Sequence, residues 1–219
     1  MVRKNWTCVL FDLDGTLADS APGIVATLRL MFRELGIAVP RSDDLLRYVG
    51  PPILDAFQDF AGMDEEKAKR ALEIYRRYYL ENGTKGVKTY PGIPSLLKAL
   101  SESRLGVALA TSKPEKPARA LLDSHDLTKY FDVIAGASAD EKRSAKADVV
   151  AEALYRLSRA GIDISSAVMV GDRDFDIEGA AENDVPTIFV EWGYGAPLEA
   201  KKAIASVENA TQLRKLLLP

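Results

Sequence analysis

The feature that most constrains this chain is a short apolar run that ends in two aspartates. Residues 8–11 read Cys-Val-Leu-Phe, and Asp12, Asp14 and Gly15 come directly after them. Four apolar residues bounded by a glycine turn predict a buried strand, so both carboxylates emerge at its carboxyl end. Open α/β sheets bind their ligands at that edge. The run therefore predicts an α/β fold whose chemistry lies at one edge of a sheet.

The spacing of the two aspartates suits a shared substrate. In an extended chain Asp12 and Asp14 point the same way, about 6.5 Å apart at roughly 3.3 Å per residue. Asp12 can then attack as a carboxylate nucleophile and form an aspartyl phosphate, while Asp14 protonates the leaving group and later activates water. The alternative is a plain Asp-Gly turn or part of a calcium loop. Residues 18–22 supply no series of further calcium ligands, which disfavours the loop.

Three motifs resemble those of the haloacid dehalogenase (HAD) superfamily phosphatases. Residues 11–20 read Phe-Asp-Leu-Asp-Gly-Thr-Leu-Ala-Asp-Ser, which is similar to the first motif of that family. An apolar run over 105–110 leads into Thr111, as in the second motif, and residues 167–176 contain an apolar run, a Gly-Asp pair and two further aspartates, as in the fourth. The motifs come in the family's order and at predicted strand ends. The resemblance covers essentially the whole chain.

The third motif of the family supplies a lysine, and its position here is less distinct. The candidates are Lys142, Arg143 and Lys146. Ser144 can cap the helix predicted over 148–159, which places Lys146 in the first turn of that helix. The sequence Ser-x-Lys-Ala-x-Val-Val also resembles the form used by one branch of the family. We therefore favour Lys146 over Lys142.

The alternation of strand-like and helical segments predicts how the core is built. A parallel Rossmann-like sheet covered by helices on both faces is expected from this alternation. The predicted strands span residues 7–11, 105–110, 131–135, 167–170 and 187–190.

About 90 residues separate the first two predicted strands, far more than one crossover needs. Residues 24–35 and 64–80 have the apolar spacing of amphipathic helices. An insertion of this kind predicts a small helical cap domain, like the caps of many HAD phosphatases. We expect the cap to span 19–88 and the α/β core to span 1–18 and 89–219.

Composition narrows the expected partners and location. The chain has 219 residues, 47% of them hydrophobic, and a net charge of −3, so it can bury a core and offers no basic surface for nucleic acid. Its one cysteine, Cys8, excludes an intramolecular disulfide and fits a reducing compartment. No apolar run approaches the length of a membrane span. We expect a cytoplasmic monomer or homodimer whose partner is a small-molecule phosphomonoester.

The resemblance implies a metal site. It assigns the metal to the Asp12 and Asp172 carboxylates and the backbone carbonyl of Asp14, with Asp176 assisting. Several negative charges beside a dianionic phosphate need a cation to offset their repulsion. Because every expected ligand atom is oxygen, that cation is predicted to be Mg²⁺.

The resemblance also implies a phosphate site in which Thr111, Ser112 and Lys146 contact the transferring phosphoryl group. Residues 48–52, 90–93 and 192–195 resemble the phosphoglycolate phosphatase-like branch of the family. The expected activity is Mg²⁺-dependent hydrolysis of a small phosphorylated metabolite: a phosphoglycolate-like acid, a nucleotide or a phosphosugar.

Two other functions stay open. A phosphosugar mutase uses the same core, and a decayed, non-catalytic phosphate-binding module would share the fold. The module should have lost one of Asp12, Asp14 and Asp172, and all three are present. A dehalogenase is disfavoured because a halide leaving group needs no proton from Asp14.

Substrate choice is expected to depend on the cap. Arg47 and Gly50 precede a predicted helix start at Pro51, and a helix N-terminus beside an arginine can bind a second anionic group. This predicts a preference for anionic esters, unless Arg47 only pairs with a nearby acid on its own helix. Arg173, inside the fourth motif, can contact substrate or pair with an acid.

Overall fold

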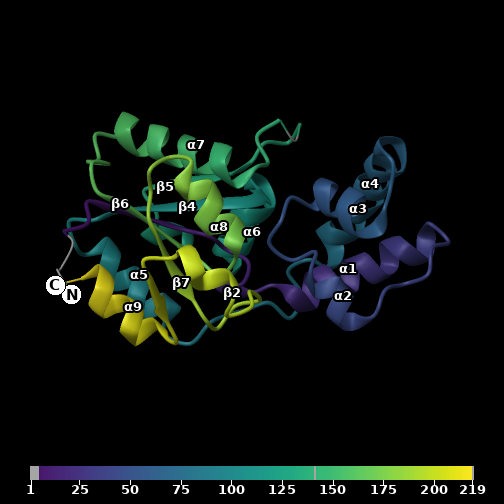
Figure 1. Cartoon of the computed structure of the whole chain (residues 1–219), viewed down its shortest axis with the longest axis horizontal. Coiled ribbons are helices and arrows are strands. Elements are labelled where there is room, and N and C mark those ends of the chain that lie inside the picture. The colour runs from purple at the N-terminus through teal and green to yellow at the C-terminus, as the bar shows by residue number, and fades with distance from the viewer. Residues whose placement is uncertain (1–4, 141, 219) are drawn as a thin grey trace.

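A six-stranded sheet forms the centre of the larger part of the molecule (Figure 1). The computed structural model describes residues 5–140 and 142–218. The strand order is β5-β4-β1-β6-β7-β8, and every neighbouring pair is parallel. The strands are β1 (Cys8–Phe11), β4 (Gly106–Pro114), β5 (Val133–Ala137), β6 (Ala167–Gly171), β7 (Thr187–Val190) and β8 (Ala205–Val207).

Helices cover both faces of this sheet, as Figure 1 shows. Side chains alternate along β1: Val9 and Phe11 belong to one hydrophobic layer, whereas Cys8 and Leu10 belong to the other. The first layer is completed by α5 (Ile93–Ser101), α6 (Glu115–Ser124) and α9 (Ala210–Leu217). The second is completed by α7 (Lys146–Arg159) and α8 (Asp174–Ala181). Both faces of β1 are therefore buried, which explains its continuous apolar sequence.

The strand order reverses direction beside β1. The chain passes from β1 to β4 and β5 on one side, and then crosses to β6 on the other side. Ligands of doubly wound sheets bind outside the carboxyl ends of the strands at such a switch point. The end of β1, where Asp12 lies, is at this position.

A helical insertion lies beyond that edge of the sheet (Figure 1). Its helices are α1 (Ala21–Glu34), α2 (Ser42–Leu46), α3 (Ile53–Ala61) and α4 (Glu65–Asn82). Two short strands, β2 (Ala18–Asp19) and β3 (Lys88–Thr89), pair antiparallel where the chain enters and leaves the insertion. The insertion has its own hydrophobic core, which includes Leu28, Phe57 and Tyr75. The predicted fold class, a parallel core with an inserted helical cap, is confirmed, and the exact domain bounds stay a prediction.

The helix predicted from residue 64 starts where the sequence indicated. Asp64 accepts a hydrogen bond from the Lys67 backbone N–H at 2.9 Å and so caps α4. The prediction that Ser144 caps α7 was wrong, because Ala145 is the N-cap residue and no side chain of the described residues caps this helix. Ser138 and Arg143 close the preceding loop: the Ser138 N–H donates to the Arg143 carbonyl, and the Arg143 N–H donates to Oγ of Ser138. The helix therefore begins at Lys146.

The strand β8 was not predicted. It has only three residues at the sheet edge, and two of them are partly or fully exposed, so no apolar run marks it in the sequence. Two single turns of 3₁₀ helix, Thr128–Tyr130 and Glu199–Lys202, complete the regular structure of the described residues. Within these residues, no helix is both long and apolar enough to cross a membrane.

Candidate active site

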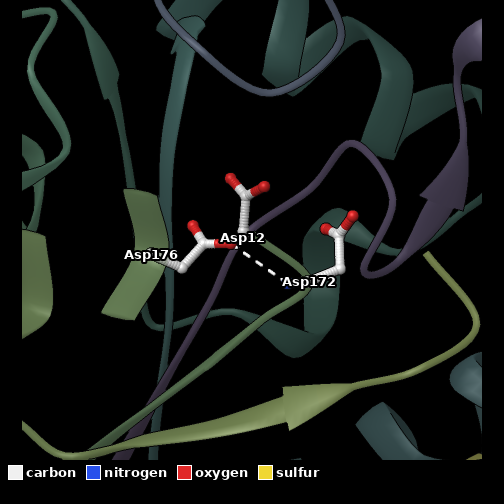
Figure 2. Close-up of side chains that lie close together, drawn as sticks. All are labelled: Asp12, Asp172 and Asp176. Atoms are coloured by element: carbon white, nitrogen blue, oxygen red, sulfur yellow. Dashed lines mark hydrogen bonds between the residues drawn. The ribbon is translucent and has the colours of Figure 1, made fainter. Parts of the chain in front are cut away.

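Three aspartates meet at the carboxyl edge of the sheet. Asp12 follows β1, Asp172 follows β6, and Asp176 lies in the first turn of α8. All three are buried, and one carboxylate oxygen from each lies within 4.8 Å of the others. Figure 2 shows the three side chains gathered around this point. Parallel strands that end at the same edge bring these distant parts of the sequence together.

Lys146 enters the same cluster from the first turn of α7. Its Nζ lies 2.6 Å from Oδ1 of Asp12 and 2.7 Å from Oδ1 of Asp176, and it donates to the Ala110 carbonyl at 3.2 Å. Burial opposes the charged form of Lys146, but the two carboxylates raise its pKa above the ordinary value. Lys142, in contrast, has a side chain that is 86% exposed and pairs with Asp140. Of the two candidate lysines, only Lys146 is at the site.

Asp172 is held in one orientation. Its Oδ1 accepts a hydrogen bond from Oγ1 of Thr16 at 2.9 Å, and its Oδ2 accepts one from the Tyr194 N–H at 2.8 Å. A side chain at Gly15 would put Cβ 2.3 Å from Oδ2 of Asp172, and Gly15 also has a φ of +89°. Only glycine fits there. The Asp-x-Asp-Gly motif thus needs its glycine to make room for an aspartate about 160 residues away.

Asp176 stabilises the turn that carries Asp172. Its Oδ2 accepts the backbone N–H groups of Asp172 and Arg173, each at 3.0 Å. Its Oδ1 contacts Lys146. This carboxylate therefore has a structural partner for each of its oxygens, whereas the donors to the Asp172 oxygens among the described residues are neutral.

The charges of the cluster do not cancel. Three carboxylates face one ammonium group, Lys146, so the cluster has two excess negative charges when all three carboxylates are ionised. Burial raises the pKa of Asp12 to about 6, although Lys146 opposes this shift. Burial, with the charges of Asp176 and Asp12, also raises the pKa of Asp172 well above its usual value. A divalent cation with a preference for oxygen ligands fits this donor set.

Asp14 forms a separate buried ion pair. Nζ of Lys113, at the end of β4, lies 2.6 Å from Oδ2 of Asp14. Burial alone would lower the pKa of Lys113, but the Asp14 charge raises it above the ordinary value. Oδ1 of Asp14 is buried and has no hydrogen-bond partner among the described residues. One oxygen of Asp14 is thus fixed by Lys113, and the other is available to a ligand.

Sequence reasoning missed the role of Lys113. It stands two residues after Thr111 in the second motif, so its place at a strand end was the available signal. Thr111 and Ser112 are themselves buried at the carboxyl end of β4, next to β1. Oγ1 of Thr111 accepts the Lys113 N–H at 3.3 Å. The three residues therefore lie together in the irregular last part of β4, beside the carboxylates.

Arg173 joins the core to the cap. Its Nε lies 3.0 Å from Oε2 of Glu199, and its Nη1 donates to the Val49 carbonyl at 2.8 Å. The sequence left open whether Arg173 contacts substrate or pairs with an acid, and in the structure it pairs with an acid. Gly50, which follows Val49, has a φ of +111°, and a Cβ there would lie 3.3 Å from Cγ of Arg173.

A cavity of about 740 Å³ lies between the cap and the core. Asp14, Ser112 and Lys113 line its core side, and Gly50 belongs to its cap side. Arg47 is not among the lining residues: it is exposed, and its guanidinium lies 4.5 Å from the centre of the Phe60 ring. The structure thus brings Gly50 to the cavity and leaves Arg47 outside it.

Comparisons of this chain with known proteins agree on one family. A family model described as haloacid dehalogenase-like hydrolase matches residues 9–190. The tyrosine-protein kinase PtkA of Mycobacterium tuberculosis is 41% identical over 95% of this chain and 70% of its own length. A phosphoglycolate phosphatase of Aquifex aeolicus is 33% identical over 85% of each chain. The crystal structure of a predicted phosphatase from Clostridium acetobutylicum superposes with a TM-score of 0.90 and 37% identity, over 97% of this chain and 98% of that one.

Proposed function

We propose, on the premise that this chain belongs to the haloacid dehalogenase-like hydrolase family, that it is a Mg²⁺-dependent phosphatase that carries the phosphoryl group on Asp12. The class of enzyme, a phosphatase, follows from the family and the phosphatase relatives. The cation and the covalent step are the proposal. One observation carries them: a buried cluster of three aspartates with one lysine lies beside Asp14, whose second oxygen has no partner among the described residues.

The proposed reaction has two steps at phosphorus. First, a carboxylate oxygen of Asp12 attacks the phosphorus atom, the ester P–O bond breaks, and Asp14 gives a proton to the departing oxygen. Asp14 then takes a proton from water, which attacks the phosphorus of the aspartyl phosphate. The Asp12–phosphorus bond breaks and inorganic phosphate leaves. Lys113 supports these roles because it fixes one Asp14 oxygen and leaves the other to exchange the proton.

In this proposal Asp12, Asp172 and the backbone carbonyl of Asp14 would hold Mg²⁺, with Asp176 close by. When bound, the cation supplies positive charge that offsets the charge on the transferring group. Asp176 would act mainly through Lys146 and the turn at Asp172, because both of its oxygens have partners.

Lys146, Thr111 and Ser112 would bind the phosphoryl oxygens. Lys146 is buried and already next to the Asp12 carboxylate, so its charge is close to the attacked phosphorus. Thr111 and Ser112 contribute hydroxyl and backbone N–H groups from the end of β4. The substrate in this proposal is a small phosphorylated metabolite, for which the name of the phosphoglycolate phosphatase relative is the support. A cytoplasmic location also stays a prediction, supported by the single buried thiol of Cys8.

The test is phosphate release from 4-nitrophenyl phosphate by the purified protein, with Mg²⁺ or with a chelator. Hydrolysis should need Mg²⁺ and should be lost in Asp12→Asn. Asp184→Asn is the matched control, because Asp184 is exposed and its left-handed backbone (φ 58°) suits asparagine equally well. The same protein should be given Mg-ATP and a tyrosine peptide, since one relative is named a tyrosine kinase. Phosphotransfer to the peptide without phosphate release would contradict the proposal.

A further inference from the structure

The cavity between cap and core is large for the smallest phosphate esters. Its volume of about 740 Å³ lies in the range that encloses ligands of drug size, roughly 300–1,000 Å³. Under the proposed function, the phosphoryl group belongs at the end near Asp14, Ser112 and Lys113, because Asp14 is two residues from the proposed nucleophile Asp12. The rest of the cavity surrounds the leaving group, so the residues there indicate what that group is.

The cap side of the cavity is mostly apolar and rich in aromatic rings; its charged lining residue, Arg76 of α4, donates a hydrogen bond to the Ala139 carbonyl. It is lined by Ile24 of α1, Tyr48, Ile53 of α3, and Leu72, Tyr75 and Tyr79 of α4. Leu80, which also lines the cavity, leaves 80% of its surface exposed. A neutral polar or sugar-like leaving group would lose hydrogen bonds to water against such a wall. An aromatic ring would instead pack against the tyrosine rings.

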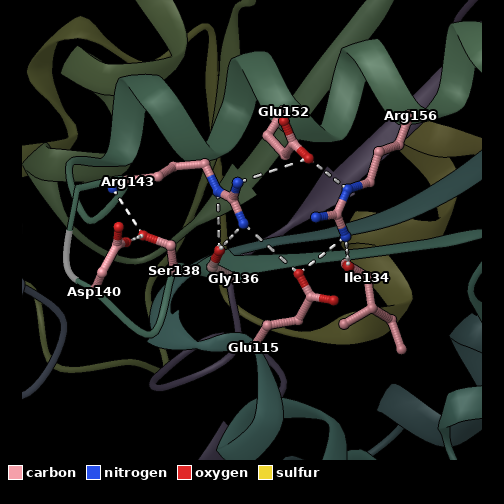
Figure 3. A network of polar contacts seen from close by, with 8 residues as sticks. All are labelled: Glu115, Ile134, Gly136, Ser138, Asp140, Arg143, Glu152 and Arg156. Carbon is pink, nitrogen blue, oxygen red and sulfur yellow. Dashed lines mark hydrogen bonds and ion pairs between the residues drawn. The ribbon is translucent and has the colours of Figure 1, made fainter.

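The core side is cationic, but some of its charges already have partners. Figure 3 shows that Arg143 lies among Glu115, Glu152 and the Gly136 carbonyl. Arg156 shares the two glutamates with it. Lys113 pairs with Asp14 in the same way. These groups are neutralised within the protein and have little charge left for a ligand.

Lys116 and Arg119 differ from them. Both lie on α6, three residues apart and therefore on one face of the helix, and both line the cavity. Both are exposed, and neither has an ion pair or a hydrogen bond with any residue that the structure describes. Two uncompensated cations thus face the apolar wall of the cap across the cavity.

We propose that this cavity selects phosphomonoesters whose leaving group is an aromatic ring with a second negative charge, which Lys116 and Arg119 attract. The proposal rests on the proposed phosphatase function and narrows its substrate. The preference for anionic esters expected from the sequence is retained, but the cations that cause it are on the core helix α6 rather than at Arg47.

Three aryl phosphates of matched reactivity test the charge preference: 4-ethylphenyl, 4-(carboxymethyl)phenyl and 4-(2-aminoethyl)phenyl phosphate. Their parent phenols ionise near a pKa of about 10, so the esters differ chiefly in side-chain charge. The expected order of kcat/KM is anionic, neutral, cationic, with the anionic ester ahead of the neutral one by about five- to tenfold at low salt. Added salt should shrink this ratio.

Substitutions test which residues cause the higher kcat/KM of the anionic ester relative to the neutral one. In the double variant Lys116→Ala/Arg119→Ala the ratio of anionic to neutral ester should fall to about 1, and Lys116→Glu/Arg119→Glu should invert it. Lys215→Ala, which removes an exposed cation outside the cavity, should leave the ratio as in the wild type. A ratio that survives the double alanine variant would overturn the assignment to these two residues.

Inhibition by phosphonates tests the preference for an aromatic ring separately from leaving-group reactivity, because phosphonates have no leaving group. 4-(Phosphonomethyl)phenylacetate should bind at least about tenfold more tightly than 3-phosphonopropanoate. Leu80→Asn, at an exposed position of the wall, should reduce that advantage. Equal inhibition by the two compounds would contradict the aromatic part of the proposal.

An aryl phosphate with a second negative charge has two possible sources. One is a small metabolite, the phosphate ester of an aromatic acid, and the other is phosphotyrosine within an acidic peptide. Comparing kcat/KM for a Glu-phosphotyrosine-Glu peptide with that for 4-(carboxymethyl)phenyl phosphate distinguishes these sources. A higher value for the peptide identifies a peptide substrate, and a higher value for the small ester identifies a metabolite. If no ester, 4-nitrophenyl phosphate included, is hydrolysed with Mg²⁺, the phosphatase function itself fails. If all are hydrolysed with equal kcat/KM, only the present inference fails.

Discussion

The ammonium group of Lys113 lies 2.6 Å from Oδ2 of Asp14, in a buried ion pair between residues 99 positions apart in the sequence. The Tyr79 ring of the cap lies over the same ammonium group, with 5.0 Å between Nζ and the ring centre. The pair therefore connects the first motif, the second motif and the cap. It also leaves Asp14 with one oxygen, Oδ1, that has no hydrogen-bond partner among the described residues.

The first prediction concerns the stability that depends on this pair. Lys113→Met should lower the free energy of unfolding by about 3–5 kcal/mol, because it leaves the Asp14 carboxylate buried without a counter-charge. Urea unfolding followed by circular dichroism measures this loss. Lys98→Met is the matched control: Lys98 pairs with Glu102 at the surface, and such a pair contributes at most about 1 kcal/mol.

A second substitution separates charge from packing. If the cost comes from the unpaired carboxylate, Lys113→Met/Asp14→Leu should be more stable than Lys113→Met alone. Equal stability of the single and double variants would mean that the lysine acts through its contacts with Tyr79 rather than through Asp14.

The second prediction separates Lys146 from Lys142. Lys146→Ala should reduce kcat and raise KM together, since it removes the buried charge next to Asp12 and the proposed phosphoryl site. Lys142→Ala should match the wild type, because that side chain is exposed and 3.6 Å from Asp140. Steady-state kinetics on 4-nitrophenyl phosphate compares them. The reverse pattern would move the third motif four residues towards the N-terminus.

The third prediction concerns pH and Mg²⁺. The folded protein raises the pKa of Asp12 from 3.8 to about 6, so the metal-free protein takes up a proton on folding between these values and loses stability as pH rises through them. Above this range the charged carboxylates repel each other, and Mg²⁺ bound as proposed would offset the repulsion. Below it, protons compete with the cation.

The rise in Tm on addition of Mg²⁺ should therefore be larger at pH 7.5 than at pH 5. Differential scanning calorimetry of chelator-treated protein, with and without Mg²⁺, gives both values. In Asp172→Asn, which removes one carboxylate of the cluster, the rise should shrink at both pH values. An equal rise at both pH values in the wild type would indicate that Mg²⁺ binds elsewhere.

The parallel core and the meeting of Asp12, Asp172 and Asp176 could be predicted from the sequence. Each aspartate follows, or lies just beyond, an apolar run, and strands of a parallel sheet end at one edge. The position of Lys146 was predictable too, because a residue in the first turn of a helix that packs on β4 and β5 lies at that same edge.

The partner of Lys113 and the position of Arg47 could not be predicted, although the sequence does place Lys113 near the end of a strand. The pairing of β4 with β5 shifts register between Thr111 and Pro114, and this irregularity sets where the end of β4 points. This register shift cannot be deduced from the spacing of residues in the sequence. Arg47 lies next to a short helix whose side-chain directions depend on packing in the cap. There the Arg47 guanidinium lies over the Phe60 ring.

The most direct test of the account is to find the phosphoryl group on Asp12. Asp14→Asn should still be phosphorylated by 4-nitrophenyl phosphate, whose leaving group needs no proton, but it should lose phosphate slowly because no carboxylate activates water. With Mg²⁺ and a rapid acid quench, mass spectrometry of the digested protein should find one phosphoryl group, on the peptide that contains Asp12. Release of a full equivalent of 4-nitrophenol with Asp12 unmodified throughout, or with the phosphoryl group on another residue, would contradict the account.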